Sequence, residues 1–430
     1  MEIINKFFNI KKLGSNIRTE ILAGLSIFLS LSYIFVVNPA ILAETGIDKS
    51  AVFFATIIVS SLATIVVGLY AKKPFALAPG LEMNSYVAFV VVAGMGFVWQ
   101  EALGLVFWSG ILMMIVNLLK LRQGIIKAIP NTLKAGLAAT VGVFLMLIAL
   151  NVSGVLVYEG VQLTGIGNLA APGAWVFLVG LLIIISLKEL KIKGAVIISI
   201  AVASVIGHMT GLADTIDPVK MSPDMFSAFF ELDFGVILEP KALSVILILF
   251  LLDFYGSIAK FIGLTRNTNI TNKNGDMPKM KEALSVDGGA TVVGSVLGTS
   301  NVTTYVESAV GIGEGGRTGL TAVITGVLML LFLLLTPLVN LVPVIATTGA
   351  LFYVGYTLFP KKNELKSYEW FDIISVLAMV VTTIITFGLD KSMLVGFGLY
   401  VVFQVARGEW RKINPYLLGS TILLLLAIFL

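Results

Sequence analysis

The sequence predicts an all-α polytopic membrane protein of about fourteen transmembrane segments, arranged as two inverted repeats of seven spans each. Three observations support this prediction. Of the 430 residues, 57% are hydrophobic and 13% are charged, whereas a soluble domain has about 25% charged residues. Apolar segments of about 17–22 residues, long enough to cross a bilayer core of roughly 30 Å, recur along nearly the whole chain. Basic residues gather in the loops after every second segment.

Seven of these spans are expected in the first half of the chain. They lie near Ile21–Val37, Ala51–Tyr70, Phe75–Val92, Leu103–Leu119, Leu133–Leu150, Ala174–Leu187 and Ala195–Thr210. The third span cannot be one regular helix, because Pro74, Pro79 and Gly80 interrupt it. A new half-helix then opens at Asn84, and Glu82 lies close to its start.

The second half of the chain is expected to hold seven more spans. They lie near Ala242–Ile262, Ala283–Leu297, Asn301–Ile312, Leu320–Leu335, Leu341–Leu358, Phe371–Gly388 and Met393–Ala406. The tenth span falls in Gly294–Gly319, whose glycines and hydroxyl residues disfavour an ordinary membrane helix. We expect an extended piece over Thr299–Tyr305 and a half-helix over Val306–Ile312 that carries Glu307. A carboxylate near the bilayer centre costs roughly 2.5–3.5 kcal/mol, so it indicates a polar site enclosed by protein.

Charge in the loops predicts the topology. Basic residues follow the even-numbered spans at Lys72 and Lys73, Lys120–Lys134, Lys188–Lys193, Arg266–Lys281, Lys361–Lys366 and Arg407–Lys412. These loops and the N-terminus are therefore expected in the cytoplasm. The linker 212–241 is rich in Asp and Glu and is expected outside the cell. It separates a first repeat, residues 1–211, from a second repeat, residues 242–430.

The two interrupted spans occupy corresponding positions of the two repeats. From Asn84 to Glu307 the offset is 223 residues, which matches one repeat length. An odd number of spans in each half inverts the second half, and broken helices at matching positions of inverted repeats point to the binding site of a secondary transporter. The apolar tail Tyr416–Leu430 could span the membrane, lie in the interface or pack on the bundle.

The eighth span supplies a third polar element. Asp253 lies at its middle and is a candidate site residue, although it could instead form a structural pair with Lys260 two turns later. We interpret Lys260 mainly as a side chain that extends to the cytoplasmic boundary. The start of the ninth span carries Asp287, which we place at the membrane interface.

Each of the other candidates has a structural alternative. Glu307 could pair with Arg317 at the end of a broken helix instead of binding a ligand. The side chain of Asn84 could cap its half-helix, a role compatible with ligand contact. For Glu82 three roles stay open: contact with substrate, transport of the coupled ion, or exposure to cytoplasmic water.

Composition excludes several classes of function. The chain has no cysteine and a single histidine, His208, so disulfides, thiolate sites and paired-histidine zinc sites are excluded. We expect no metal, no other cofactor and no catalytic residue, since no HExxH or paired-aspartate protease motif is visible. The net charge of +4 reflects topology and not a nucleic-acid partner. Two half-helices at a repeat interface suit alternating access and not a channel.

Three stretches resemble a known family. They are FFNIKKLGSNIRTEILAGLSIFLSLSYIFVVNPAIL, ALAPGLEMNSYVAF and ATVVGSVLGTSNVTTYVESAVGIGEGGRTGLTAVITG. The chain resembles the AzgA-like purine permeases for adenine, guanine and hypoxanthine, within the nucleobase transporter superfamily of xanthine and uracil permeases. The resemblance implies fourteen spans, short strands in spans 3 and 10, a core domain from spans 1–4 and 8–11, and a gate domain from spans 5–7 and 12–14. Its functional residues correspond to Asn84, Asp253 and Glu307.

The resemblance also implies proton-coupled uptake of a nucleobase across the cell membrane, with Asp253 and Glu307 as proton-coupling candidates. The chain departs from the family pattern at Gly256, where a second aspartate is usual, near Lys260, where threonine is usual, and at Glu82, where glycine is usual. These departures concern the substrate and leave the fold expectation intact. The alternatives are another nucleobase or a small organic or inorganic anion. We expect the protein to lie in the lipid bilayer, where it could form a homodimer.

Overall fold

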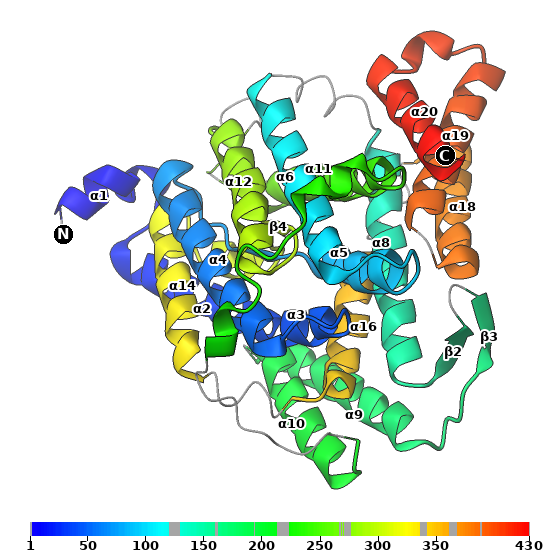
Figure 1. Ribbon diagram of the computed structural model, residues 1–430. Helices are drawn as coiled ribbons and strands as arrows, with labels where there is room; N and C mark the ends of the chain where they lie inside the picture. Colours follow the sequence, from blue (N-terminus) through cyan, green and yellow to red (C-terminus); the bar gives the residue numbers. More distant parts are fainter. Residues whose placement is uncertain are drawn as a thin grey trace.

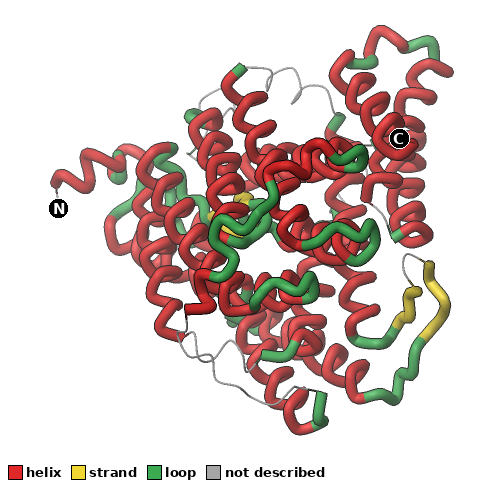
Figure 2. Tube along the Cα trace, in the orientation of Figure 1, coloured by secondary structure: helices red, strands yellow, loops and turns green. Residues whose placement is uncertain are grey.

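The computed structural model describes residues 2–119, 130–159, 162–192, 194–212, 223–265, 268, 270, 277–335, 342–360, 368–387 and 389–429. The protein is predominantly helical, and two short strands lie among the helices near its centre (Figures 1 and 2). The first half contains α1 (Glu2–Phe8), η1 (Lys11–Leu13), α2 (Ile17–Leu31), α3 (Ile34–Ala43), α4 (Lys49–Tyr70), β1 (Leu77–Pro79), α5 (Leu81–Ser85), η2 (Tyr86–Val92), α6 (Trp99–Leu118), α8 (Asn131–Val152), β2 (Leu156–Glu159), β3 (Gln162–Ile166), α9 (Pro172–Glu189) and α10 (Ala195–Met209).

The linker contains two short 3-10 helices, η3 (Pro223–Phe226) and η4 (Phe234–Leu238). The second half contains α11 (Ala242–Thr265), α12 (Met280–Leu297), β4 (Val302–Thr304), α13 (Ser308–Gly313), α14 (Gly319–Leu331), η5 (Phe332–Leu335), η6 (Val344–Thr347), α16 (Thr348–Thr357), α18 (Trp370–Thr386), α19 (Leu389–Ala406), η7 (Trp410–Lys412) and α20 (Pro415–Phe429).

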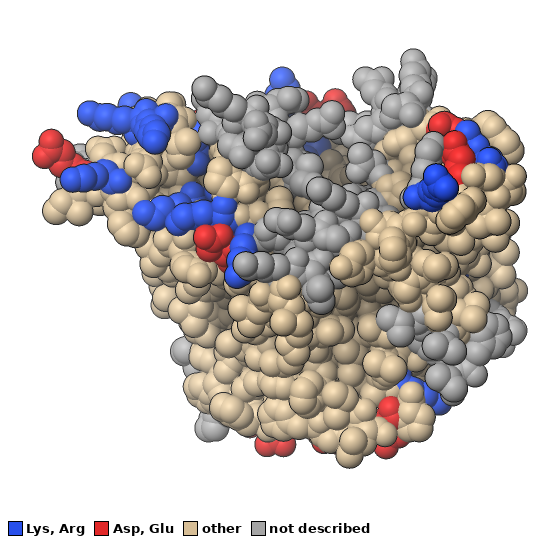
Figure 3. All heavy atoms as spheres, turned by 90° about the horizontal axis from the view of Figure 1, so that it is seen from above, with Lys and Arg blue, Asp and Glu red and all other residues tan. Residues whose placement is uncertain are grey.

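The helices and the surface are those of a multi-pass membrane protein. Among the described residues, five helical stretches are long and apolar enough to cross a bilayer: Ile17–Ala43, Lys49–Tyr70, Trp99–Leu118, Ala135–Val152 and Pro172–Glu189. Shorter apolar helices accompany them. Figure 3 shows a broad band of uncharged surface between an edge where most of the visible Lys and Arg side chains gather, with some Asp and Glu among them, and an opposite edge with a few charged side chains of both signs. Such a band suits contact with lipid.

The two interrupted segments meet as an antiparallel strand pair. Leu77 of β1 is opposite Thr304 of β4, and Pro79 is opposite Val302. The pairing continues beyond the strands, because Gly80 N donates to Asn301 O at 2.8 Å. Main-chain groups that are not helical need protein partners at membrane depth, where water is absent, and this pairing supplies many of them.

Two buried threonines complete the strand pair in the same way on its two sides. Thr64 of α4 donates to Leu77 O at 3.1 Å and accepts from Leu77 N at 2.9 Å. Thr291 of α12 donates to Val302 O at 3.2 Å and accepts from Val302 N at 3.0 Å. Each threonine thus satisfies both main-chain groups of one strand residue from the helix that precedes the strand.

The helices pack in two groups. In the first group α14 and α12 contact α4, while α12 and α11 contact α6; in the second α16 and α18 contact α8, and α9 contacts α10 and α16. Each group contains a close approach of two glycines. A Cβ at Gly319 would collide with Gly68 O between α14 and α4, and one at Gly142 would collide with Gly355 O between α8 and α16. Small residues let membrane helices approach closely.

The structure departs from the sequence-based expectations in two places. The first span is interrupted, because α2 ends at Leu31 and α3 begins at Ile34. The hairpin of β2 and β3 lies outside an all-α expectation. Within the linker, η3 packs on α4 and η4 packs on α6.

The apolar tail packs on the bundle, where α20 contacts α11 and α19. Parts of the basic loops, residues 120–129, 271–276 and 361–367, lie outside the described residues, as do residues 213–222 of the linker.

A buried glutamate of α2 joins the first span to the segment after α13. Glu20 is fully buried and accepts hydrogen bonds from the main-chain N–H groups of Arg317 at 3.0 Å, Thr318 at 3.2 Å and Thr321 at 3.3 Å. The hydroxyls of both threonines donate to it as well. Because α14 begins at Gly319, Glu20 caps its N-terminus from another helix and favours its positive dipole end.

We predict that Glu20→Gln destabilises the protein. The glutamine keeps one acceptor oxygen but replaces the other with a donor, which leaves N–H groups of α14 without an acceptor. The expected loss is about 1–3 kcal/mol, the scale of a hydrogen bond to a charged group. The apparent Tm of purified protein in detergent measures it, with Glu44→Gln on an exposed side chain as the matched control. Equal Tm values for the two variants would contradict the capping role.

Candidate functional site

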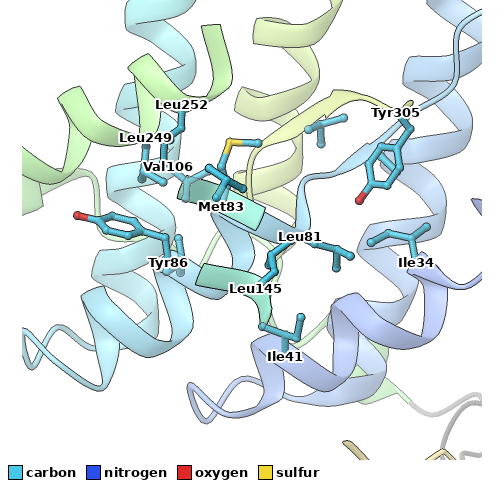
Figure 4. Close-up of a cluster of buried hydrophobic side chains, with 14 of the residues drawn as sticks. Ile34, Ile41, Leu81, Met83, Tyr86, Val106, Leu145, Leu249, Leu252 and Tyr305 are labelled. Atoms are coloured by element: carbon cyan, nitrogen blue, oxygen red, sulfur yellow. The ribbon is translucent and has the colours of Figure 1, made fainter. Parts of the chain in front are cut away.

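The site forms where the half-helices α5 and α13 extend from the strand pair. Apolar side chains of α5 and of the elements packed around it form one cluster, as Figure 4 shows for Ile34, Ile41, Leu81, Met83, Val106, Leu145, Leu249 and Leu252. These side chains are buried. The polar groups described below therefore lie in an apolar surrounding, where hydrogen bonds and charges have large effects.

Glu307 lies at the N-terminal end of α13. Its Oε1 accepts from the hydroxyl of Tyr33 at 2.9 Å, and Tyr33 occupies the break between α2 and α3. Within the described chain, Oε2 is buried and has no hydrogen-bond partner. The alternative of a pair with Arg317 is wrong, because that guanidinium donates to the carbonyl oxygens of Ile312 and Gly316. One carboxylate oxygen of Glu307 is thus oriented by Tyr33 and the other is available.

Asn84 lies inside α5 and does not cap it. The N-cap residue is Gly80, and Asn84 N donates to Gly80 O at 2.9 Å. The Asn84 side chain donates to Oδ1 of Asn38. The Nδ2 group of Asn38 in turn donates to Thr56 Oγ1 at 2.6 Å and to Thr299 Oγ1 at 3.0 Å. Asn84 Oδ1 has no hydrogen-bond partner among the residues that the structure describes. Asn38 therefore fixes the amide of Asn84 with its oxygen free to accept.

Asp253 lies on α11 against the strand pair. Its Oδ2 accepts from Thr291 at 3.3 Å and Asn301 at 3.4 Å, and the Asn301 amide also donates to Ser109 at 2.9 Å. The residue is 1% exposed, and Oδ1 is without a hydrogen-bond partner in the described ranges. The alternative of a structural pair with Lys260 is wrong, because Lys260 pairs with another carboxylate.

That carboxylate is Glu82. Lys260 Nζ lies 3.1 Å from Glu82 Oε1 and 3.4 Å from Thr303 Oγ1. The side chains of Lys260 and Glu82 are 14% and 16% exposed, so the ammonium does not extend to the cytoplasmic boundary as expected. Pairing with a carboxylate on a neighbouring segment stabilises this cation better than extending its side chain a long way to reach water. Glu82 is thus paired with a cation and partly exposed, and its role in transport stays a prediction.

Asp287 is not at the interface. It is fully buried, and its Oδ1 accepts from Thr304 of β4 at 3.4 Å. The expected interfacial position is wrong because the span does not start near Ala283: α12 already begins at Met280. The sequence reasoning also missed Tyr33 and Asn38. The polar Asn38 directly after an apolar run was the available signal.

The arrangement offers mostly acceptors to a ligand. Free oxygens of Glu307 and Asn84 accept N–H groups, and the Lys260 ammonium donates. A Cβ added at Gly256 of α11 would meet no heavy atom within 4 Å, which leaves space beside Asp253 and Lys260. Among the described residues there is no group of three acidic, histidine or cysteine side chains arranged to hold a metal ion.

Residues 18–361 match the model of the Permease family, Xan_ur_permease. The chain belongs to this family. The permease is 34% identical over 429 residues to the adenine permease AdeP of Escherichia coli, covering 99% of this chain and 96% of that protein. It is 34% identical over 432 residues to the guanine/hypoxanthine permease PbuO of Bacillus subtilis, covering 98% and 100%.

The fold is that of solved transporters. The transmembrane domain of the cyanobacterial bicarbonate transporter BicA matches the permease with a TM-score of 0.64 at 15% identity, over 88% of this chain and 97% of that one. Murine Slc26a9, an anion transporter in the inward-facing state, matches with a TM-score of 0.62 at 12% identity, over 94% and 72%. At such low identity the likeness extends to the fold alone.

We predict that Lys260→Met destabilises the permease and that a second change restores it. The single variant leaves Glu82 charged and without its partner, which we expect to cost about 1–3 kcal/mol, below the range for fully buried pairs because both groups are partly exposed. Lys260→Met with Glu82→Gln should recover most of this loss. Apparent Tm values measure both, with Lys241→Met at the exposed start of α11 as the control. If the double variant is no more stable than the single one, the loss of stability in Lys260→Met comes from lost packing and not from the unpaired charge of Glu82.

Proposed function

We propose that this chain is a secondary active permease that takes up a purine nucleobase together with a proton. The observation that carries the proposal is the free, buried Oε2 of Glu307 beside an oxygen oriented by Tyr33, in a member of the Permease family. The names of AdeP and PbuO supply the substrate class. A catalytic function has no support in a permease family.

Purine recognition follows from the hydrogen-bonding chemistry. A purine presents N–H donors along its edge, and a carboxylate binds such donors in charge-assisted hydrogen bonds. Glu307 offers Oε2 and the remaining lone pair of Oε1, while the Asn84 oxygen accepts a further N–H group. The exposed fraction of Glu82 and Lys260 and the space at Gly256 suggest the side from which the base enters. In this proposal Glu82 contacts the substrate through its outer oxygen.

Proton coupling is assigned chiefly to Asp253, with Glu307 as a second candidate. Glu82 is less suited to this role, because it already forms an ion pair with Lys260. Asp253 has no such salt bridge, since Lys260 Nζ is hydrogen-bonded to Glu82. Protonation of Asp253 in an apolar surrounding removes the cost of a buried charge, so its charge state can change during transport. We expect no further cofactor.

We infer fourteen spans in two inverted repeats, residues 1–211 and 242–430, with the linker 212–241 outside. The matched roles of Thr64 and Thr291 at the two strands support the repeats. The two packing groups support a core domain from spans 1–4 and 8–11 and a gate domain from spans 5–7 and 12–14. The basic edge in Figure 3 supports a cell-membrane location with the N-terminus in the cytoplasm. Homodimer formation stays a prediction.

The alternative substrates are a different nucleobase, such as uracil or xanthine, or a small anion. The anion is disfavoured by the carboxylates of Glu82, Asp253, Asp287 and Glu307, which would repel it. The fold shared with BicA is not an argument for bicarbonate, because one fold hosts many substrates.

The direct test is uptake of labelled adenine, guanine and hypoxanthine into cells that lack their own purine transporters. We expect accumulation of at least one of them in cells that express the chain, and its loss when a proton uncoupler is added. Excess unlabelled uracil should compete weakly. Uptake of none of the three purines would overturn the substrate assignment. Uptake that the uncoupler does not change would overturn the assignment of proton coupling.

Glu307→Gln should weaken base binding by roughly ten- to hundred-fold, equivalent to about 1.5–3 kcal/mol. The glutamine keeps one acceptor and replaces the other with a donor that repels N–H groups. Equilibrium binding of the labelled base to purified protein measures the effect, and Glu44→Gln on an exposed side chain is the control. Unchanged affinity in Glu307→Gln would remove Glu307 from the binding site.

A further inference from the structure

Asp287 and Asp253 come from neighbouring helices and lie close enough beside β4 to interact electrostatically. Asp287 and Thr291 are four residues apart on α12 and so share one face of that helix. Thr291 donates to Asp253 Oδ2 at 3.3 Å, while Thr304 of β4 donates to Asp287 Oδ1 at 3.4 Å. Both aspartates are buried, with exposures of 1% and 0%. They form one polar cluster, which we name the aspartate pair.

The aspartate pair has more acceptors than donors. Three oxygens in it, Asp253 Oδ1, Asp287 Oδ2 and Asn301 Oδ1, are buried and have no hydrogen-bond partner in the part of the chain that is described. Asn301 is itself fully buried, and its amide nitrogen donates to Asp253 Oδ2 at 3.4 Å, so its amide is directed into the pair. A carboxyl O–H would satisfy such an oxygen, whereas a second negative charge would add repulsion.

The groups that face the pair do not neutralise both acids. On α11, the neutral hydroxyl of Ser257 lies 2.8 Å from Thr303 Oγ1 of β4 and also interacts with Asp287, and on α6 the neighbour is Ser109, a hydroxyl. Lys260 of α11 interacts electrostatically with both aspartates, but its hydrogen bonds go to Glu82 of α5 and to Thr303. Because the one ammonium of Lys260 is shared with Glu82, Asp253 and Asp287 together would carry a surplus of negative charge if both were ionised. Binding of one proton removes this surplus.

We propose that Asp253 and Asp287 share the coupling proton. In the loaded state one carboxyl is protonated and its O–H donates toward an oxygen of the other acid or of Asn301. The proton binds from outside with the base, forming one O–H bond, and leaves to the cytoplasmic water when that bond breaks. The charge of the pair changes by one unit in each direction. This inference rests on the proposed proton-coupled uptake, and it gives Asp287 a positioning and proton-holding role.

The test uses the full chain in proteoliposomes with the purine that the wild-type protein carries. An imposed difference of one pH unit should drive about tenfold accumulation in a one-proton symporter. Asp287→Asn should lose this accumulation, reaching only the outside concentration, while exchange of labelled for unlabelled base stays within about threefold of wild type. Asp48→Asn is the matched control, because Asp48 is exposed and asparagine also caps α4; it should accumulate normally.

Asp287→Glu provides a second variant that keeps a titratable group, and it covers the case in which Asp287→Asn fails to fold. It should retain accumulation, with a shifted pH dependence of uptake. Normal accumulation by Asp287→Asn, or an unchanged pH profile of Asp287→Glu, would overturn the shared proton. Loss of exchange together with accumulation in folded Asp287→Asn would assign Asp287 to base binding instead. Dependence on sodium rather than on pH would make the pair a cation site and also overturn the proposal.

A wild-type protein that carries no purine in these liposomes would refute the proposed function and not the shared proton alone. Release or uptake of protons by purified wild-type protein on base binding then separates the two. A base that binds without moving a proton contradicts the aspartate pair, whereas a base that does not bind contradicts the substrate assignment.

Discussion

The structure depends on the need to satisfy main-chain N–H and C=O groups where water is absent. Two strands lie side by side at the centre of the helices. Each main-chain polar group of these strands that stayed unpaired would cost several kcal/mol. The antiparallel pairing of β1 with β4 meets part of this need. The hydroxyls of Thr64 and Thr291 meet another part, and Ser308 accepts from Ala76 N at 3.0 Å. Because these partners fix the strands, they also fix where α5 and α13 begin.

The acids around the strand pair differ in their partners, and this difference suggests different roles. Glu82 has a cation, Lys260, so its charge is compensated. Glu307 accepts from the phenol of Tyr33, which orients it without neutralising it. Among the described residues, the hydrogen bonds to Asp253 and Asp287 come from hydroxyl and amide donors at 3.3–3.4 Å. Because the partners of these acids differ, binding and coupling can reside in different carboxylates.

Much of the fold and part of the site could be predicted from the sequence. Apolar length gave the positions of the helices, since a bilayer imposes one span length on any helix. Pro74, Pro79 and Gly80 marked the break before α5, and the glycines and hydroxyl residues around Glu307 marked the break before α13. Asn84, Asp253 and Glu307 could be selected as candidates because a polar residue deep in a membrane is costly and therefore informative. Span length, helix breaks and buried polar residues are local properties, because each depends on residues that are close together in the sequence.

The tertiary structure alone decided the partners. Lys260 and Glu82 are 178 residues apart, and neither the period of a helix nor the loop charge relates them. Asp287 looked interfacial because its depth depends on where α12 starts. Glu20 lies in the first turn of α2, yet it caps a helix about 300 residues later. Which acid meets a cation, a hydroxyl or another acid is set by how segments distant in sequence pack, and the sequence determines that packing only through the whole fold.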